Sequence, residues 1–226
     1  MDRDAPASPR CLLAIDSSTE QAGVALFDGV RRAEEVWDAG RTQTTSLLGQ
    51  IHHLLDLLGM TVADLGAVAV ATGPGTFNGL RVGVSVAKGL ALGLDLPLLG
   101  VPTLQAAALP FATGARPVVP VVAAGRGRLV WAMSDGDGAG WTERRPPRNG
   151  TVDELASWLI ALERPVVVGE LDQEQEARIR AVDGVTIPPV TLRSRRPGAV
   201  AELAWRRWQA GDVDDPAALE PVYLGR

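Results

Sequence analysis

The sequence is poor in the residues that cross-link a protein, ligate metals or anchor a chain in a membrane, and each shortage excludes a class of protein. Cys11 is the sole cysteine among 226 residues, so no intramolecular disulfide can form and a cytoplasmic location is expected. His52 and His53 are the only histidines, and adjacent helical positions point about 100° apart, which excludes a helical pair of metal ligands. We therefore predict no metal site. Lys88 interrupts the longest apolar run, so no membrane span is expected either.

Basic residues are outnumbered by acidic ones. Lysine and arginine total 22 against 27 aspartates and glutamates, which gives a formal net charge of −5 and a pI near 5.1. This balance argues against a protein that holds nucleic acid alone on a broad basic surface. The composition is otherwise typical of a globular chain of one or two domains, with 46% hydrophobic and 22% charged residues. Residues 1–10 lack the apolar core of a signal peptide and are expected to form a flexible tail.

Apolar periodicity and turn residues predict two similar sets of elements. The first set has strands at 11–16, 22–27, 30–38, 65–71 and 98–101, and helices at 42–58 and from Thr76 or Asn78 to Leu94. The second set has strands at 118–123, 129–133, 141–144 and 166–168, and helices at 103–111, from Thr151, at 172–182 and at 197–211. Asp135–Gly138 is expected as a hairpin loop and Arg145–Gly150 as an irregular loop.

The repeated pattern favours two related lobes with a cleft between them. We place the first lobe at 11–102 and a smaller, degenerate second lobe at 103–226, with the helix near 197–211 able to pack back on the first lobe. The predicted fold class is therefore α/β.

Two short motifs of the first lobe have the residue types of an anion site. Asp16-Ser17 ends the first strand, where a carboxylate and a hydroxyl can hold a metal ion or orient a phosphate. Gly73-Pro74-Gly75, followed by Thr76, lies between a strand and a helix, a geometry that aims backbone N–H groups at an anion. The structural alternatives stay open, since Asp16 and Ser17 can simply cap a hairpin and the glycines can simply turn the chain. Possible anion or nucleotide contacts are thus Asp16, Ser17, Gly73, Gly75 and Thr76.

The helix after this turn carries small residues four apart. Gly79, Gly83, Ala87 and Ala91 form this row, and a glycine inside a helix costs about 1 kcal/mol relative to alanine. Close approach of another backbone would compensate for that cost. The pattern fits both a core helix packed on a sheet and a helix that also packs on a partner subunit.

The chain resembles the TsaB (YeaZ) family. The resemblance rests on Asp16-Ser17-Ser18, the run G-P-G-T-F-N-G-L-R from Gly73, the run A-K-G-L-A from Ala87, and the terminal P-V-Y-L-G-R. It implies two ribonuclease-H-like lobes of the actin/Hsp70/sugar-kinase (ASKHA) type. Two features differ from the family pattern: Gln43-Thr44-Thr45 replaces His-Ser/Thr-Glu, and the run from Ala123 to Val130 lacks the aspartate, glutamate and tyrosine of D-A-R-x-G-E-V-Y.

The resemblance implies a non-catalytic scaffold subunit for threonylcarbamoyladenosine synthesis in tRNA. It implies TsaD-like and TsaE-like partners, a homodimer when alone, indirect contact with tRNA, and no tightly bound cofactor, with ATP and a metal belonging to the partner subunits. No catalytic residue is assigned. The expected partner interface lies on the first two helices and comprises Leu47, Leu48, Ile51, Leu54, Leu55, Phe77, Gly79, Leu80, Gly83, Ala87 and Leu90.

Three alternatives to this function remain. An autonomous ATP-dependent phosphotransferase or ATPase would use Asp16 and the turn at Gly73–Gly75 on metal and phosphates. A metalloprotease is disfavoured because the ligands are missing. Direct contact with tRNA would use the arginines near the C-terminus, which are Arg193, Arg195, Arg196, Arg206 and Arg207.

Overall fold

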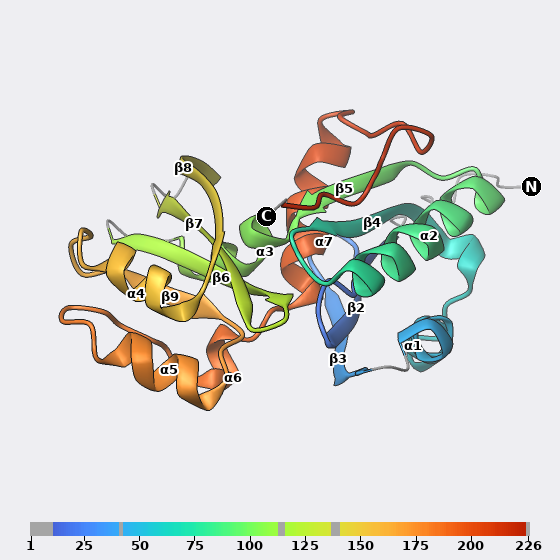
Figure 1. The fold of residues 1–226 in the computed structure, drawn as a ribbon. Helices are drawn as coiled ribbons and strands as arrows, with labels where there is room; N and C mark the ends of the chain where they lie inside the picture. Colours follow the sequence, from blue (N-terminus) through green and yellow to red (C-terminus); the bar gives the residue numbers. More distant parts are fainter. Residues whose placement is uncertain (1–10, 41–42, 113–115, 137–140, 225–226) are drawn as a thin grey trace, which may run out of the picture.

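The computed structural model describes residues 11–40, 43–112, 116–136 and 141–224. The predicted tail at 1–10, Asp137-Gly138 of the predicted hairpin loop, and the terminal Gly225-Arg226 lie outside the described residues. The elements form two lobes that lie side by side, with the helices α3 (Thr103–Ala108) and α7 (Pro197–Gln209) near their junction (Figure 1).

The first lobe is built on a five-stranded mixed sheet. Its strands are β1 (Cys11–Asp16), β2 (Gln21–Phe27), β3 (Arg32–Asp38), β4 (Leu65–Gly73) and β5 (Leu98–Pro102), in the order β3-β2-β1-β4-β5. The hairpins make β1–β2 and β2–β3 antiparallel, whereas β1–β4 and β4–β5 are parallel. Every residue of β1 and β4 is buried, because helices cover both faces of the sheet.

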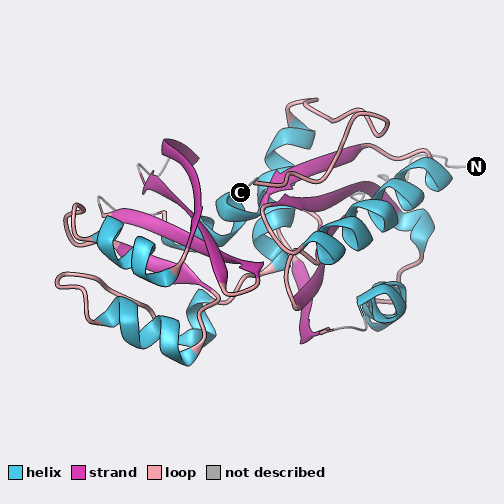
Figure 2. Cartoon of the chain, in the orientation of Figure 1, coloured by secondary structure: helices cyan, strands magenta, loops and turns pink. Residues whose placement is uncertain are grey.

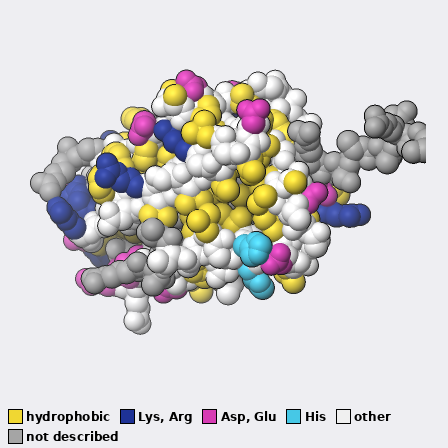
Figure 3. Space-filling model, turned by 90° about the vertical axis from the view of Figure 1, so that its right-hand side faces the viewer, with side chains coloured by type: hydrophobic (Ala, Val, Ile, Leu, Met, Phe, Trp, Pro, Cys, Tyr) yellow, Lys and Arg dark blue, Asp and Glu magenta, His cyan; other side chains and the backbone are white. Residues whose placement is uncertain are grey.

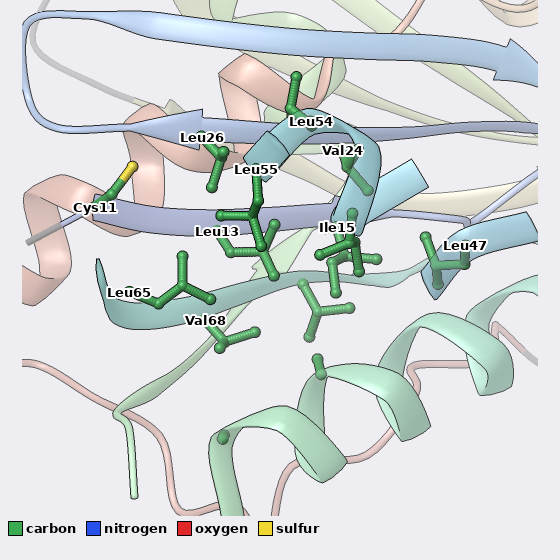
Figure 4. Close-up of a cluster of buried hydrophobic side chains, with 14 of the residues drawn as sticks. Cys11, Leu13, Ile15, Val24, Leu26, Leu47, Leu54, Leu55, Leu65 and Val68 are labelled. Atoms are coloured by element: carbon green, nitrogen blue, oxygen red, sulfur yellow. The ribbon is translucent and has the colours of Figure 1, made fainter. Parts of the chain in front are cut away.

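Alternation along the strands divides the apolar side chains between two cores. On one face Leu13 and Ile15 pack with the helices α1 (Gln43–Leu57) and α2 (Phe77–Leu94), as Figure 4 shows for the α1 side. On the other face Leu12 and Ala14 pack with α7. The helix α7 therefore belongs structurally to the first lobe, although it follows the whole second lobe in sequence.

The second lobe repeats the arrangement with one strand fewer. Its sheet has the order β8-β7-β6-β9, from β6 (Pro117–Gly125), β7 (Arg128–Gly136), β8 (Trp141–Gly150) and β9 (Val166–Gly169). The helices α4 (Val152–Leu159) and α5 (Gln173–Arg180) share a core with this sheet (Figure 2). The two related sheets confirm the predicted α/β fold of two ribonuclease-H-like lobes, of which the second is smaller.

Two predicted loops differ from the structure. Asp135-Gly136, predicted as the start of a hairpin loop, is the end of β7 and pairs with β8. Arg145–Gly150 is part of β8, whose register pairs Leu129 with Gly150 and Met133 with Arg145. The strand tolerates Pro146-Pro147 because β8 lies at the edge of its sheet. On its outer side no neighbouring strand needs the N–H groups that proline lacks. The short helix α6 (Val190–Arg193) and the 3₁₀ turn η1 (Val62–Asp64) have no counterpart in the prediction. The helix predicted at 103–111 is α3 followed by the 3₁₀ turn η2 (Leu109–Phe111).

The small-residue row of α2 faces the chain's own β-sheet. A Cβ on Gly83 would lie 2.3 Å from Ser17 Oγ and 3.6 Å from Val70, and the Ser17 hydroxyl donates a hydrogen bond to the Gly79 carbonyl at 2.8 Å. The close approach that these small residues permit is therefore between α2 and the end of β1.

Two glycine-to-alanine variants on this helix should change stability in opposite directions. Gly83→Ala should lower the free energy of unfolding by about 1–3 kcal/mol, because its Cβ overlaps Ser17. Gly89→Ala should raise it by about 1 kcal/mol, because Gly89 is exposed and a Cβ placed on it would have nothing within 4 Å. Urea unfolding of the isolated chain measures both. Equal effects at the two positions would contradict the inward orientation of the row.

Burial of Cys11 makes the stability of the protein depend on pH. Desolvation raises the pKa of its thiol from 9.0 to about 11, and the side chain is 5% exposed. An unfolded thiol ionises near pH 9, so the folded state should lose stability as the pH rises from 9 to 11. Comparing urea unfolding of the wild type and Cys11→Ala at pH 8 and pH 10.5 isolates this contribution. A difference between the two proteins that does not change with pH would refute it.

Candidate functional site

The loop after β1 lies where the two lobes meet, and a buried arginine fills this junction. Arg195, just before α7, is 4% exposed, and its Nη1 lies 2.9 and 3.0 Å from the two carboxylate oxygens of Asp16. The same nitrogen donates to Ser18 Oγ. Its Nε donates to Glu170 Oε1, which follows β9 of the second lobe, at 2.9 Å. One guanidinium thus joins carboxylates of both lobes.

The remaining polar atoms of this cluster are also paired. Arg195 Nη2 donates to Thr19 Oγ1 at 2.7 Å and to the Gln21 carbonyl at 2.9 Å, while the Thr19 hydroxyl donates to Glu170 Oε2 at 2.6 Å. Burial alone would lower the pKa of the Arg195 guanidinium, but the charges of Asp16 and Glu170 and their hydrogen bonds hold it above its ordinary value. Arg195 therefore stays charged inside the protein.

The residues predicted to hold an anion lie close together, but the protein itself uses their polar groups. Asp16 is bound by Arg195, and the Ser17 hydroxyl donates to α2. The Gly73 N–H donates to Thr103 Oγ1 at 3.1 Å, and the Thr76 N–H donates to the Ser18 carbonyl at 2.7 Å.

Steric contacts close the turn as well. A Cβ on Gly75 would lie 2.2 Å from the Ser18 carbonyl oxygen, and one on Gly73 would lie 2.5 Å from the Val222 carbonyl oxygen. These glycines let the chain pack on itself. The donor set therefore does not fit the phosphates or the metal ion of a nucleotide.

This geometry predicts that the isolated chain does not bind magnesium-ATP. Calorimetric titration to about 1 mM ATP with magnesium should give only the heat of dilution, because Asp16 is already neutralised by Arg195. Titration in the presence of EDTA is the control. A saturable heat that disappears in Asp16→Asn would overturn this assignment.

The residues predicted for a partner interface divide into two groups. Leu48 and Phe77 are exposed by 55% and 53%, and Leu90 is half-buried. The others lie in the chain's own core and present no side chain to a partner: Leu47, Ile51, Leu54, Leu55, Gly79, Leu80, Gly83 and Ala87. For these eight residues the expectation of an intermolecular contact is corrected, because the apolar stripes of both helices pack on the sheet.

The outer side of the two helices nevertheless exposes several large apolar residues, which lie among polar ones such as His52, Asp56 and Arg81. Besides Leu48 and Phe77 it exposes Leu57 and Leu92, and Leu58 follows α1. Figure 3 shows hydrophobic side chains gathered on this face beside the two histidines. A Cβ added to any of the exposed glycines Gly49, Gly89 and Gly93 would have nothing within 4 Å. We call this face, formed by the exposed residues of α1 and α2 with Leu58, the α1–α2 surface.

Sequence reasoning missed Leu57 and Leu92. It concentrated on the stripe with the strongest periodicity, which is the buried one. The signal was present in the sequence, because both leucines lie off that stripe on helices that already have an apolar inner face.

Comparison with known proteins identifies the family. The family model described as "TsaD: tRNA N6-adenosine threonylcarbamoyltransferase" matches residues 37–177. The Bacillus subtilis tRNA threonylcarbamoyladenosine biosynthesis protein TsaB is 31% identical over 94% of this chain and 93% of that protein. The chain belongs to the TsaB (YeaZ) family.

Two further relatives agree with this assignment. The Escherichia coli TsaB protein is 38% identical over 54% of this chain, and the matched segment spans 53% of that relative's length. A Pseudomonas aeruginosa crystal structure, described as an uncharacterised protein with similarity to peptidase YeaZ, superposes with a TM-score of 0.78. It is 26% identical, and the superposition covers 95% of this chain and 99% of that one.

The C-terminal arginines of this TsaB-family chain do not form a free basic face. Arg193 and Arg195 are buried, which corrects the proposal that they reach RNA. The other three pair with acidic residues of the first lobe and its C-terminal segment: Arg196 with Glu34, Arg206 with Glu202, and Arg207 with Asp212 and Asp214.

Two further observations concern metal and membrane. Among the described residues, no group of three His, Cys, Asp or Glu side chains could hold a metal ion. His52 lies 3.3 Å from Asp56 and His53 lies 3.3 Å from Glu35, so the histidines point to different carboxylates. None of the helices in the described parts of the chain is long and apolar enough to cross a membrane.

Proposed function

We propose that this chain is a non-catalytic scaffold subunit in the synthesis of threonylcarbamoyladenosine in tRNA. It binds a TsaD-like protein through the α1–α2 surface, and a TsaE-like ATPase joins the assembly. The observation that carries the proposal is the set of large apolar residues exposed on helices whose inner sides already fill a core. Exposed apolar area of this kind typically marks a protein interface.

The match to the TsaD family model supports the choice of partner. The matched residues, 37–177, include both α1 and α2. Two chains that share these helices can pack them against each other about an approximate twofold axis, as equivalent surfaces do in a symmetric dimer. The exposed Gly49, Gly89 and Gly93 leave room for a close backbone approach in such a packing.

The occupied junction between the lobes supports a role without catalysis. Arg195 binds Asp16, the carboxylate that the alternative ATP-dependent activity would need for its metal, so we assign nucleotide and metal to the partner subunits. The paired C-terminal arginines likewise favour indirect contact with tRNA through the complex. When the partner is absent, a second copy of this chain is the expected occupant of the α1–α2 surface.

Substitutions on the α1–α2 surface should abolish partner binding and leave the fold intact. Leu92→Arg and Leu48→Glu each place a charge on a leucine that is 69% or 55% exposed. The arginine in the last turn of α2 also suits the dipole of that helix. We expect at least a tenfold loss of affinity, about 1.4 kcal/mol, for the cognate TsaD-like protein. Titration calorimetry measures this loss, and size-exclusion chromatography shows whether the two proteins co-elute.

Ile160→Arg is the matched control. Ile160 is 75% exposed but lies at the end of α4 in the second lobe, so the same kind of substitution should leave affinity unchanged. Reconstituted tRNA modification should fall with Leu92→Arg and stay unchanged with Ile160→Arg. The proposal is wrong if the folded wild-type chain fails to bind the partner at micromolar concentration, or if the isolated chain performs the transfer.

A further inference from the structure

We propose that Arg195 is a positioning residue for the α1–α2 surface. Its guanidinium is a built-in cation that holds the two lobes together and, through the loop Ser17–Thr19, fixes the first turns of α2 for docking. This inference rests on the proposed function, because its readout is partner affinity. It assigns a role in binding to a residue that is buried and lies on neither docking helix.

The first step is the connection between the lobes. Arg195 donates hydrogen bonds to the loop and strand after β1 and to Glu170, the residue after β9. Two of these partners, Thr19 and Glu170, are 151 positions apart in the sequence. The neighbouring Arg193 extends the connection, since it donates to the Gly169 carbonyl at 3.0 Å and pairs with Glu176 of α5. In the segment before α7, Arg193 therefore binds the second lobe and Arg195 binds both lobes.

The chemistry requires a guanidinium. Arg195 uses Nε, Nη1 and Nη2 in three directions, toward Glu170, Asp16 and Thr19. A lysine ammonium has three donors on one nitrogen and cannot span these acceptors. Loss of the cation would leave two carboxylates facing a junction without compensating charge, which is unfavourable in a buried site.

The second step is the connection from Arg195 to α2. Arg195 holds Ser18 and Thr19 by their hydroxyl groups. The same loop holds the start of α2, because the Thr76 N–H donates to the Ser18 carbonyl at 2.7 Å and Ser17 Oγ donates to the Gly79 carbonyl at 2.8 Å.

Packing makes this connection stiff. A Cβ at Gly75 would overlap Ser18, and a Cβ at Gly83 would overlap Ser17. The loop and the helix are therefore in close contact, with no free space between them at these positions. A shift of the loop after loss of Arg195 therefore displaces the helix end that carries Phe77, and with it part of the α1–α2 surface.

The experiment compares two neighbouring arginines. Arg195→Ala should weaken binding of the cognate TsaD-like protein by roughly tenfold, within the usual range of coupling between distant sites. Arg196→Ala removes the ion pair between a half-exposed arginine and Glu34, which lies outside the Arg195 cluster, and should change affinity by less than about twofold. Hydrogen exchange should show faster exchange at the first turns of α2 in Arg195→Ala only.

Chemical rescue separates positioning from general damage to the fold. Methylguanidinium at about 10 mM can enter the space left in Arg195→Ala and bind the two remaining carboxylates as a charge-assisted pair. It should restore both partner affinity and the protection of α2. The same concentration of sodium chloride should restore neither, and methylguanidinium should not affect the wild type.

Each outcome decides a different question. If the wild type binds no partner, the proposed function fails. If the wild type binds and Arg195→Ala binds as tightly as Arg196→Ala, this inference fails while the proposed function stands. If Arg195→Ala does not fold, Arg195→Lys takes its place: weakened binding with faster exchange at α2 supports the inference, and wild-type affinity refutes it.

Discussion

The structure depends on one buried cluster of charges. Asp16, Glu170 and Arg195 come from three distant parts of the chain and meet where the lobes join. A buried ion pair stabilises a protein only when its geometry satisfies most of the hydrogen-bonding atoms, because removing charges from water is costly. Here the guanidinium has acceptors on all three nitrogens, so its charge is compensated inside the protein. The loop after β1, whose hydroxyl groups bind this guanidinium, also holds the start of α2 by hydrogen bonds.

The helix α2 connects this cluster to the surface. Its inner side carries Gly79, Gly83 and Ala87 because the loop Ser17–Thr19 and the sheet approach it closely. Its outer side exposes Phe77 and Leu92, and the Phe77 ring also contacts Tyr223 and Arg81. The small residues of the inner side are explained by packing within the chain, whereas Leu92 on the outer side has no such explanation in the described part of the chain.

Local signals made much of the fold predictable from the sequence. Short apolar runs located β1 and β4, and Thr151 was predicted as the start of α4, where it forms a capping box with Glu154. Long-range relations were not predictable. Nothing near Asp16 indicates an arginine 179 positions later, so its carboxylate was open to interpretation as a metal ligand. Similarly, periodicity found the apolar stripe of α2 but could not say that the chain's own sheet covers it.

The edge strand β8 illustrates a different limit. Two prolines and three arginines have low intrinsic preference for a strand, and only pairing with β7 makes the segment extended.

The pairing of Asp16 with a side chain differs from the pairing with a bound ligand in one thermodynamic respect. When a cleft closes on a nucleotide, the fraction of closed molecules rises with the nucleotide concentration. The size of this shift is limited by how much more tightly the nucleotide binds the closed state than the open one. Arg195 is covalently part of the chain, so its local concentration is fixed and the junction does not respond to such a ligand. The loop that holds the start of α2 is bonded to this fixed cation, so the arrangement at the start of α2 needs no bound ligand. For the partner binding proposed above, such preorganisation would lower the cost of ordering the surface.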